Sequence, residues 1–177
     1  KLSRFITRYH SPDRVAHLLK DRENLFSTLG GVERAVTILF SDVRGFTTMS
    51  EGMKTKELVT QLNEYLSRMV EKVFISTGSI DKFIGDAVMA LWGSMPQPGD
   101  SGQGLKHDAL NAVTSAVAMR EVLVELNAGW KARGMQEWGI GIGIHQGNVI
   151  VANVGSAPPY ERMELTVIGD NVNLASR

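Results

Sequence analysis

The chain has 177 residues, of which 43% are hydrophobic and 21% are charged, and this balance is typical of a soluble globular protein. Its length suits one domain with a substantial hydrophobic core. Nineteen basic residues balance nineteen acidic residues, so net charge gives no reason to expect binding to nucleic acid or to an anionic membrane. The absence of cysteine excludes disulfides and thiolate metal sites, and no apolar stretch approaches the roughly 20 residues that span a bilayer.

The two ends of the sequence suggest a longer parent protein. The chain begins at Lys1 rather than at a methionine, and it stops at Arg177 inside a predicted helix. We therefore expect an upstream regulatory domain, and further residues of the same domain after Arg177. Within the segment we expect a helical lead-in over residues 1–34 and a folded domain over residues 35–177. A cytoplasmic location fits the lack of cysteine, and we expect no direct contact of this segment with a membrane.

Helix and strand patterns follow one another along the chain. In the lead-in, Ser11-Pro12-Asp13 is typical of a helix start, with a capping serine and a proline at the first helical position. Beyond it, apolar runs and glycine breaks predict, in order, a strand over residues 35–42, a helix over 54–75, strands over 79–83 and 87–92 joined by a hairpin at Gly85-Asp86, a helix over 106–127, strands over 138–145 and 148–154 paired around Gln146-Gly147, a strand over 164–168 and a helix over 171–177. This order predicts an α+β fold, with helices on one face of an antiparallel-rich sheet.

Both long predicted helices carry apolar residues at helical spacing, and in the second helix these residues are predicted to lie on one face. In the first helix they are Leu58, Val59, Leu62, Leu66, Met69, Val70 and Val73. In the second they are Leu110, Val113, Ala116, Val117, Leu123 and Leu126.

Two aspartates, Asp42 and Asp86, each close a short apolar run beside a glycine. A carboxylate at the end of a buried strand is costly unless a cation meets it, and two that converge would hold Mg²⁺ or Mn²⁺ against a phosphate chain. The turn after Asp42 contains Gly45 and leads into Phe46-Thr47, where backbone N–H groups would bind phosphate. The ordinary alternatives are that Asp42 caps the following helix and that Asp86 serves only its hairpin turn.

A third segment carries Asn173 and Arg177, which are four residues apart and share a helix face. An amide and a guanidinium there suit a sugar and a phosphate, although a surface hydrogen-bonding pair explains them more simply when the segment is taken alone. We expect Asp170 or Asn171 to cap this helix. His145, at a strand end, is expected to make a structural hydrogen bond rather than to take part in catalysis.

Together these segments resemble the catalytic domain of the class III nucleotide cyclases. The resemblance runs from about Ala35 to Arg177 and rests on motifs that occur in the family's order, namely Phe40–Thr47, Ile80–Gly93, Gly141–Gly147 and Thr166–Arg177. It implies a ferredoxin-like βαββαβ palm with helices packed on its sheet. It also implies the conversion of ATP into 3′,5′-cyclic AMP and pyrophosphate with two divalent cations, Mg²⁺ or Mn²⁺.

The resemblance also implies a role for each matched residue. Asp42, Asp86 and the carbonyl of Val43 would bind the metals. Lys82 would donate to the adenine ring nitrogen N1 and Thr166 would accept from the 6-amino group, a pairing that favours ATP over GTP.

The remaining implied residues handle the ribose and the phosphates. Asn173 would orient the ribose, Arg177 would stabilise charge on the α-phosphate in the transition state, and Arg162 would reach the phosphates. In this family the active site lies between two catalytic domains, so a homodimer with shared sites is expected.

Three alternatives remain. The first is a guanylate cyclase, and the second is a catalytically silent regulatory or dimerisation module. The third is a diguanylate cyclase or polymerase-like enzyme, which the sequence disfavours because the turn of two glycines, two acids and a phenylalanine is absent.

Overall fold

The computed structural model describes residues 31–94, 104–156, 159 and 162–177. In chain order its elements are β1 (Val32–Val43), α4 (Phe46–Gly52), α5 (Thr55–Ile75), β2 (Ser79–Ile84), β3 (Ala87–Trp92), α6 (Gly104–Ala132), β4 (Ile140–Ser156), β5 (Arg162–Ile168) and α7 (Asp170–Ser176). The helix predicted to start at Ser11 lies outside the described residues. Within these ranges, none of the helices combines the length and hydrophobicity needed to cross a membrane.

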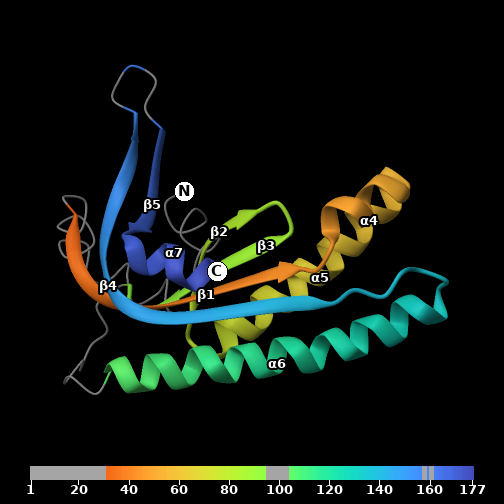
Figure 1. Ribbon diagram of the computed structural model, residues 1–177, viewed down its shortest axis with the longest axis horizontal. Coiled ribbons are helices and arrows are strands. Elements are labelled where there is room, and N and C mark those ends of the chain that lie inside the picture. Colours follow the sequence, from red (N-terminus) through yellow and green to blue (C-terminus); the bar gives the residue numbers. More distant parts are fainter. Residues whose placement is uncertain (1–30, 95–103, 157–158, 160–161) are drawn as a thin grey trace.

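Within the described ranges, five strands form a single sheet in the order β2-β3-β1-β4-β5, and every neighbouring pair is antiparallel. Strand β3 lies between β1 and β2, and β1 lies between β3 and β4, so each of the two helical connections passes over one strand. This is the βαββαβ arrangement of a ferredoxin-like palm, and the predicted fold class is confirmed. In Figure 1 the long helices α5 and α6 run side by side along the sheet.

Two hydrophobic cores lie on opposite faces of the sheet, because successive residues of a strand point to opposite sides. On one face Leu39 of β1 packs in a cluster with Met69 of α5 and Trp130 of α6. On the other face Ile38 of β1 belongs to a cluster that includes Ala175 of α7. The prediction that helices cover one face therefore holds for α5 and α6, whereas α7 covers part of the opposite face.

The predicted hairpin at Gln146-Gly147 is wrong. Instead of two strands over 138–145 and 148–154, the structure has one continuous strand, β4, which pairs with β1 from Val43↔Ile140 to Val32↔Val151. The glycine has a packing role rather than a turning role, because a Cβ at Gly147 would clash with the side chain of Asn171 in α7. In the sequence, Gln146-Gly147 resembled a turn because a polar residue followed by glycine is common in turns.

The predicted apolar face of α6 is only partly correct. Leu110, Val113 and Val117 were assigned to the same face as Leu123, but they are 62%, 49% and 52% exposed, whereas Leu123 is buried. The buried residues of this helix are Ala112, Ser115, Met119, Val122, Leu123 and Trp130. Apolar residues occur on several sides of α6, so their spacing alone did not select the side that packs.

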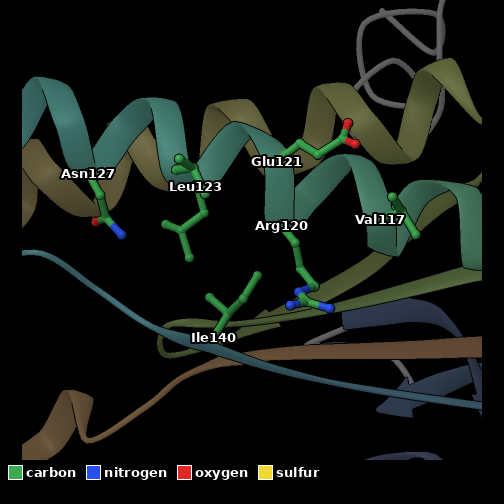
Figure 2. A pocket seen from close by; sticks show the side chains of 7 residues that line it. Val117, Arg120, Glu121, Leu123, Asn127 and Ile140 are labelled. Atoms are coloured by element: carbon green, nitrogen blue, oxygen red, sulfur yellow. The ribbon is translucent and has the colours of Figure 1, made fainter.

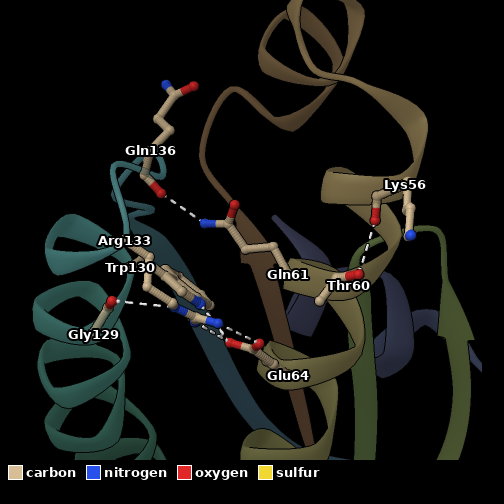
Figure 3. A network of polar contacts seen from close by, with 8 residues as sticks. All are labelled: Lys56, Thr60, Gln61, Glu64, Gly129, Trp130, Arg133 and Gln136. Atoms are coloured by element: carbon tan, nitrogen blue, oxygen red, sulfur yellow. Dashed lines mark hydrogen bonds and ion pairs between the residues drawn. The ribbon is translucent and has the colours of Figure 1, made fainter.

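Polar contacts clamp α5 to the C-terminal end of α6 (Figure 3). Arg133 Nη1 and Nη2 donate to the Glu64 carboxylate at 2.9 and 2.6 Å, and Trp130 Nε1 donates to Glu64 Oε2 at 2.8 Å. Gln61 Nε2 donates to the carbonyl of Gln136 at 2.6 Å. The hydrogen bonds from Arg133 and then Trp130 lower the pKa of Glu64 to about 2. The clamp therefore keeps an ionised Glu64 between the two helices that support the sheet.

Candidate active site

The carboxylates of Asp42 and Asp86 meet at one end of the sheet. Asp42 lies near the end of β1, and Asp86 lies in the turn between β2 and β3, which the antiparallel pairing of β1 with β3 brings alongside. The backbone N–H of Val43 donates to Asp86 Oδ2 at 3.0 Å. Desolvation, followed by the hydrogen bond and negative charge of Asp86, raises the pKa of Asp42, and only the Val43 backbone opposes the shift. Two like charges held together in this way favour a bound cation.

The donor set fits a hard divalent cation that also contacts its substrate. Among the described residues, no group of three or more His, Cys, Asp or Glu side chains could hold a metal ion. Two aspartates would therefore leave most of the coordination shell to backbone carbonyl, water and phosphate oxygens. Mg²⁺ binds in this manner, through one or two carboxylates and the phosphates of its substrate.

The turn after Asp42 leaves its carboxylate available. Helix α4 is preceded by Gly45, which takes a left-handed conformation with φ 69°, and no side chain caps the helix. The alternative in which Asp42 caps α4 therefore does not describe this structure. The ring of Phe46 is half-buried and packs edge-on against Trp138 with centroids 5.9 Å apart, while Thr47 is exposed.

Lys82 and Thr166 converge on a buried carboxylate. Thr166 Oγ1 donates to Asp81 Oδ2 at 2.8 Å, and Lys82 Nζ lies 3.6 Å from the same oxygen and 3.1 Å from Glu164 Oε1. Asp81 is only 5% exposed. Burial raises its pKa to about 6, although the hydrogen bond from Thr166 and the charge of Lys82 act in the opposite direction.

These contacts join the two edges of the sheet, since β2 and β5 are its outermost strands. Figure 1 shows how this happens, because β4 curves along its length and carries β5 round with it. In β2 the pairing register shifts between Ile80 and Lys82, which makes Asp81 the extra residue of a bulge. Bulges re-aim side chains, and here Asp81 reaches β5.

Asn171 of helix α7 contacts two residues of β4 through its side-chain amide. Asn171 Nδ2 donates to the carbonyl of Asn148 at 2.8 Å, and Asn171 Oδ1 lies 2.8 Å from His145 Nε2. The helix is preceded by Gly169 and has no side-chain cap, so the prediction that Asp170 or Asn171 caps it is wrong. The structural hydrogen bond expected for His145 is confirmed.

The structure thus sorts the predicted site residues into separate groups. One contact joins Asp42 to Asp86, and another network joins Lys82 to Thr166 through Asp81. Asn173 and Arg177 lie on the exposed surface of α7 and at its end. Arg162 begins β5, opposite Ser156 of β4.

A hollow of about 410 Å³ lies elsewhere, between α6 and the beginning of β4 (Figure 2). It is lined by Val117, Arg120, Glu121, Leu123, Val124, Asn127 and Ile140. None of the predicted site residues contributes to its wall, so we do not assign it to the site.

Residues 31–177 match the family described as "Adenylate and Guanylate cyclase catalytic domain". The chain belongs to this family. The match includes every described strand and helix, so the resemblance inferred from the motifs is confirmed.

Curated relatives of this cyclase domain include enzymes named adenylate cyclase. That of Anabaena cylindrica is 40% identical over 148 residues, covering 81% of this chain and 26% of the relative. Adenylate cyclase 1 of Rhizobium meliloti is 37% identical over 142 residues, covering 80% of this chain and 20% of the relative. The chain therefore spans about a quarter or less of these relatives.

Solved structures of both nucleotide classes resemble this cyclase domain. The adenylyl cyclase CyaB from P. aeruginosa is 40% identical with a TM-score of 0.74, over 83% of this chain and 71% of that chain. The guanylyl cyclase Cya2 is 39% identical with a TM-score of 0.73, over 82% and 69%. Because the two are about equally similar, the choice of base must be argued from the residues of this chain.

Asp81 is the member of this cyclase domain's site region that sequence reasoning missed. Its signal was weak, since an acid beside Lys82 near a turn looks like a solvated residue. Only the meeting of β2 with β5 reveals that its carboxylate is buried between Lys82 and Thr166.

Proposed function

We propose that this domain is an adenylate cyclase, which converts ATP into 3′,5′-cyclic AMP and pyrophosphate at sites shared within a homodimer. The observation that carries the proposal is the convergence of Lys82 and Thr166 on one buried oxygen of Asp81. Lysine only donates hydrogen bonds, and a threonine hydroxyl can accept one. Adenine offers the matching pattern, because its N1 accepts and its 6-amino group donates, whereas guanine offers the reverse.

Asp42 and Asp86 form the metal-binding part of the proposed site, with the carbonyl of Val43 as a further ligand. Burial, followed by the hydrogen bond and negative charge of Asp86, raises the pKa of Asp42, and a bound cation would offset these effects, which supports this role. Two divalent cations, Mg²⁺ or Mn²⁺, would neutralise the triphosphate and lower the pKa of the ribose 3′-hydroxyl.

The other residues bind and orient the nucleotide. Backbone N–H groups at Phe46 and Thr47 and the side chain of Arg162 would contact the phosphates, and Asn173 would hold the ribose. The 3′-oxygen then forms a bond to the α-phosphorus while the bond to the bridging oxygen breaks, so pyrophosphate leaves and the hydroxyl proton passes to solvent or phosphate. Arg177 would stabilise the charge that develops on the α-phosphate.

A homodimer would complete each site, with the aspartates from one protomer and the base, ribose and α-phosphate contacts from the other. Exposure supports this arrangement, since Asp42, Asn173 and Arg177 are all exposed in the single chain. Upstream domains would then regulate the enzyme by controlling how the two protomers meet.

The main alternative substrate is GTP, which the resemblance to a guanylyl cyclase at 39% identity favours. A catalytically silent module is the alternative of another class. The presence of all the matched positions, from Asp42 to Arg177, counts against it.

Substrate competition tests the proposal. The full-length protein is incubated with equal concentrations of ATP and GTP, in Mg²⁺ and separately in Mn²⁺, and cyclic AMP and cyclic GMP are quantified, with an Asp42→Asn variant as the blank. We expect cyclic AMP to dominate in both metals. Predominant cyclic GMP would overturn the choice of substrate, and no cyclic nucleotide above the blank would overturn the enzymatic function.

A further inference from the structure

The strongest unassigned feature is the buried carboxylate of Asp81. It is 5% exposed, and burial is costly for a charged group unless partners compensate. Its partners come from two elements, Lys82 from β2 and Thr166 from β5. Glu164 of β5 is a second acid that contacts the same Lys82 ammonium. Nothing in the metal-binding or phosphate-binding parts of the proposed site needs this group.

When Asp81 is ionised, Thr166 must be the donor in the hydrogen bond between the two side chains. A carboxylate accepts but cannot donate, and a threonine hydroxyl has a single proton. That proton points from Thr166 Oγ1 to Asp81 Oδ2 over 2.8 Å. The hydroxyl can therefore offer a third group only its lone pairs, so Thr166 becomes an acceptor and nothing else.

The charge of Asp81 also bears on Lys82. The ammonium lies 3.6 Å from Asp81 Oδ2 and 3.1 Å from Glu164 Oε1, and its side chain is 29% exposed. The ammonium has three N–H donors. If one is directed at Asp81 and one at Glu164, the third remains for a ligand. A fixed donor thus stands beside a fixed acceptor.

We propose that Asp81 is a specificity-determining positioning residue, which orients the Thr166 hydroxyl as an obligate acceptor and thereby makes the site reject 6-oxopurine nucleotides. The inference rests on the proposed function, in which Lys82 and Thr166 contact the base. Without Asp81 the hydroxyl would be free to turn, and it would donate to a 6-oxo group as readily as it accepts from a 6-amino group. Such a site discriminates between bases because the wrong base leaves a buried polar group without a hydrogen-bond partner.

Inosine triphosphate isolates this effect from others. Its base carries a 6-oxo group and a protonated N1, as guanine does, but it lacks the 2-amino group and so adds no bulk relative to adenine. The measured quantity is the ratio of kcat/KM for ATP to kcat/KM for inosine triphosphate, in the full-length protein. For Asp81→Ala we expect this ratio to fall about tenfold from the wild-type value, as suits one misdirected hydrogen bond.

A double-mutant cycle shows whether Asp81 acts through Thr166. Thr166→Val removes the hydroxyl while keeping the side chain's shape, and it should also lower the ratio. If Asp81 works by orienting that hydroxyl, Asp81→Ala has no further effect on the ratio in the Thr166→Val background. Full effects of both changes in the double variant would overturn the inference.

A merely structural role for Asp81, as a tie between β2 and β5, predicts a different result. Loss of that tie would lower stability or kcat for both nucleotides and leave their ratio unchanged. Val122→Ala is the matched control. Val122 of α6 is buried in the hydrophobic core, so its truncation lowers stability away from the base and should keep the wild-type ratio. Asp81→Leu, which fills a similar space but has no acceptor for the Thr166 hydroxyl, serves if the alanine variant does not fold, and it too should lower the ratio.

The outcomes separate the two proposals. An unchanged ratio in every foldable Asp81 variant, with a wild-type enzyme that prefers ATP, would overturn the role of Asp81 alone. No turnover of either nucleotide by the wild type would overturn the proposed function, and this inference with it.

Discussion

The backbone N–H of Val43 donates a 3.0 Å hydrogen bond to Oδ2 of Asp86 and so ties the end of β1 to the turn between β2 and β3. One consequence is that the second carboxylate is held beside Asp42 without help from any ligand. Such preorganisation matters because a group that is already in place needs no rearrangement when charge appears. It also leaves two acidic groups in mutual repulsion, which a cation would relieve.

Asp42→Asn or Asp86→Asn should lower cyclic AMP formation by at least about two orders of magnitude, since a catalytic metal ion is worth several kcal/mol. The fold should persist, because each change removes a repulsion. Activity assays and thermal unfolding of the metal-free protein measure the two effects. We expect the unfolding midpoint of Asp42→Asn to equal or exceed that of the wild type. Normal turnover in either variant would refute the metal assignment.

Lys82 can be tested more cleanly by Lys82→Met than by a charge reversal. Lys82→Glu would place a third acid beside Asp81 and Glu164, which already lie 3.6 and 3.1 Å from the ammonium. Lys82→Met keeps the apolar stem and removes the donor to N1. We expect kcat/KM for ATP to fall about tenfold, mostly through KM. An unchanged KM for ATP would count against contact with the base.

The stability of the domain should depend on pH through Asp81, whose pKa burial raises from 3.8 to about 6. A carboxyl with a raised pKa holds its proton more tightly in the folded protein, so its favourable contribution is complete below pH 3.8 and is lost as pH rises through about 6. Asp81→Asn stays neutral, so at pH 7.5 its free energy of unfolding should exceed that of the wild type by up to about 3 kcal/mol. Urea denaturation at pH 7.5 and at pH 4 measures this gain, most of which should be lost at the lower pH. A gain of equal size at both values would show that charge burial is not its cause.

Gly147→Ala should disturb the packing of α7 on β4, because an added Cβ would clash with the Asn171 side chain. Displacement of α7 moves Asn173 and Arg177, so cyclic AMP formation should fall more steeply than secondary structure content. Gly141→Ala is a matched control for stability in the same strand, since a Cβ there meets nothing within 4 Å. Thermal unfolding and activity are measured together. Full activity in Gly147→Ala would mean that the position of α7 tolerates the change.

Local sequence patterns correctly predicted a strand that is mostly buried and a helix that buries one face. The strand over residues 35–42 falls within β1, and the helix over 54–75 matches α5 (Thr55–Ile75). Two aspartates at the ends of apolar runs were expected to converge, and the contact between Val43 and Asp86 places them together. These predictions succeeded because they needed only the spacing of apolar residues and the positions of the two aspartates in the sequence.

Features that depend on distant packing could not be predicted in this way. Gly147 looks like a turn residue in sequence, and only α7 explains why a glycine occupies the middle of β4. Val113 and Val117 sit at helical spacing, yet the packed side of α6 is set by its neighbours. The role of Asp81 depends on a bulge and on the curvature that brings β5 to β2. Each of these is decided by contacts between segments far apart in the chain.

The most direct test of a shared two-metal site is to mix two inactive variants of the full-length protein. Asp42→Asn lacks a metal ligand and Arg177→Ala lacks the transition-state arginine, so a heterodimer of the two contains one site with every residue intact. Random exchange should therefore restore about a quarter of the wild-type cyclic AMP formation, while neither variant alone is active. No recovery, in a mixture whose heterodimers are confirmed by differently tagged chains, would contradict a site built from two copies of this domain.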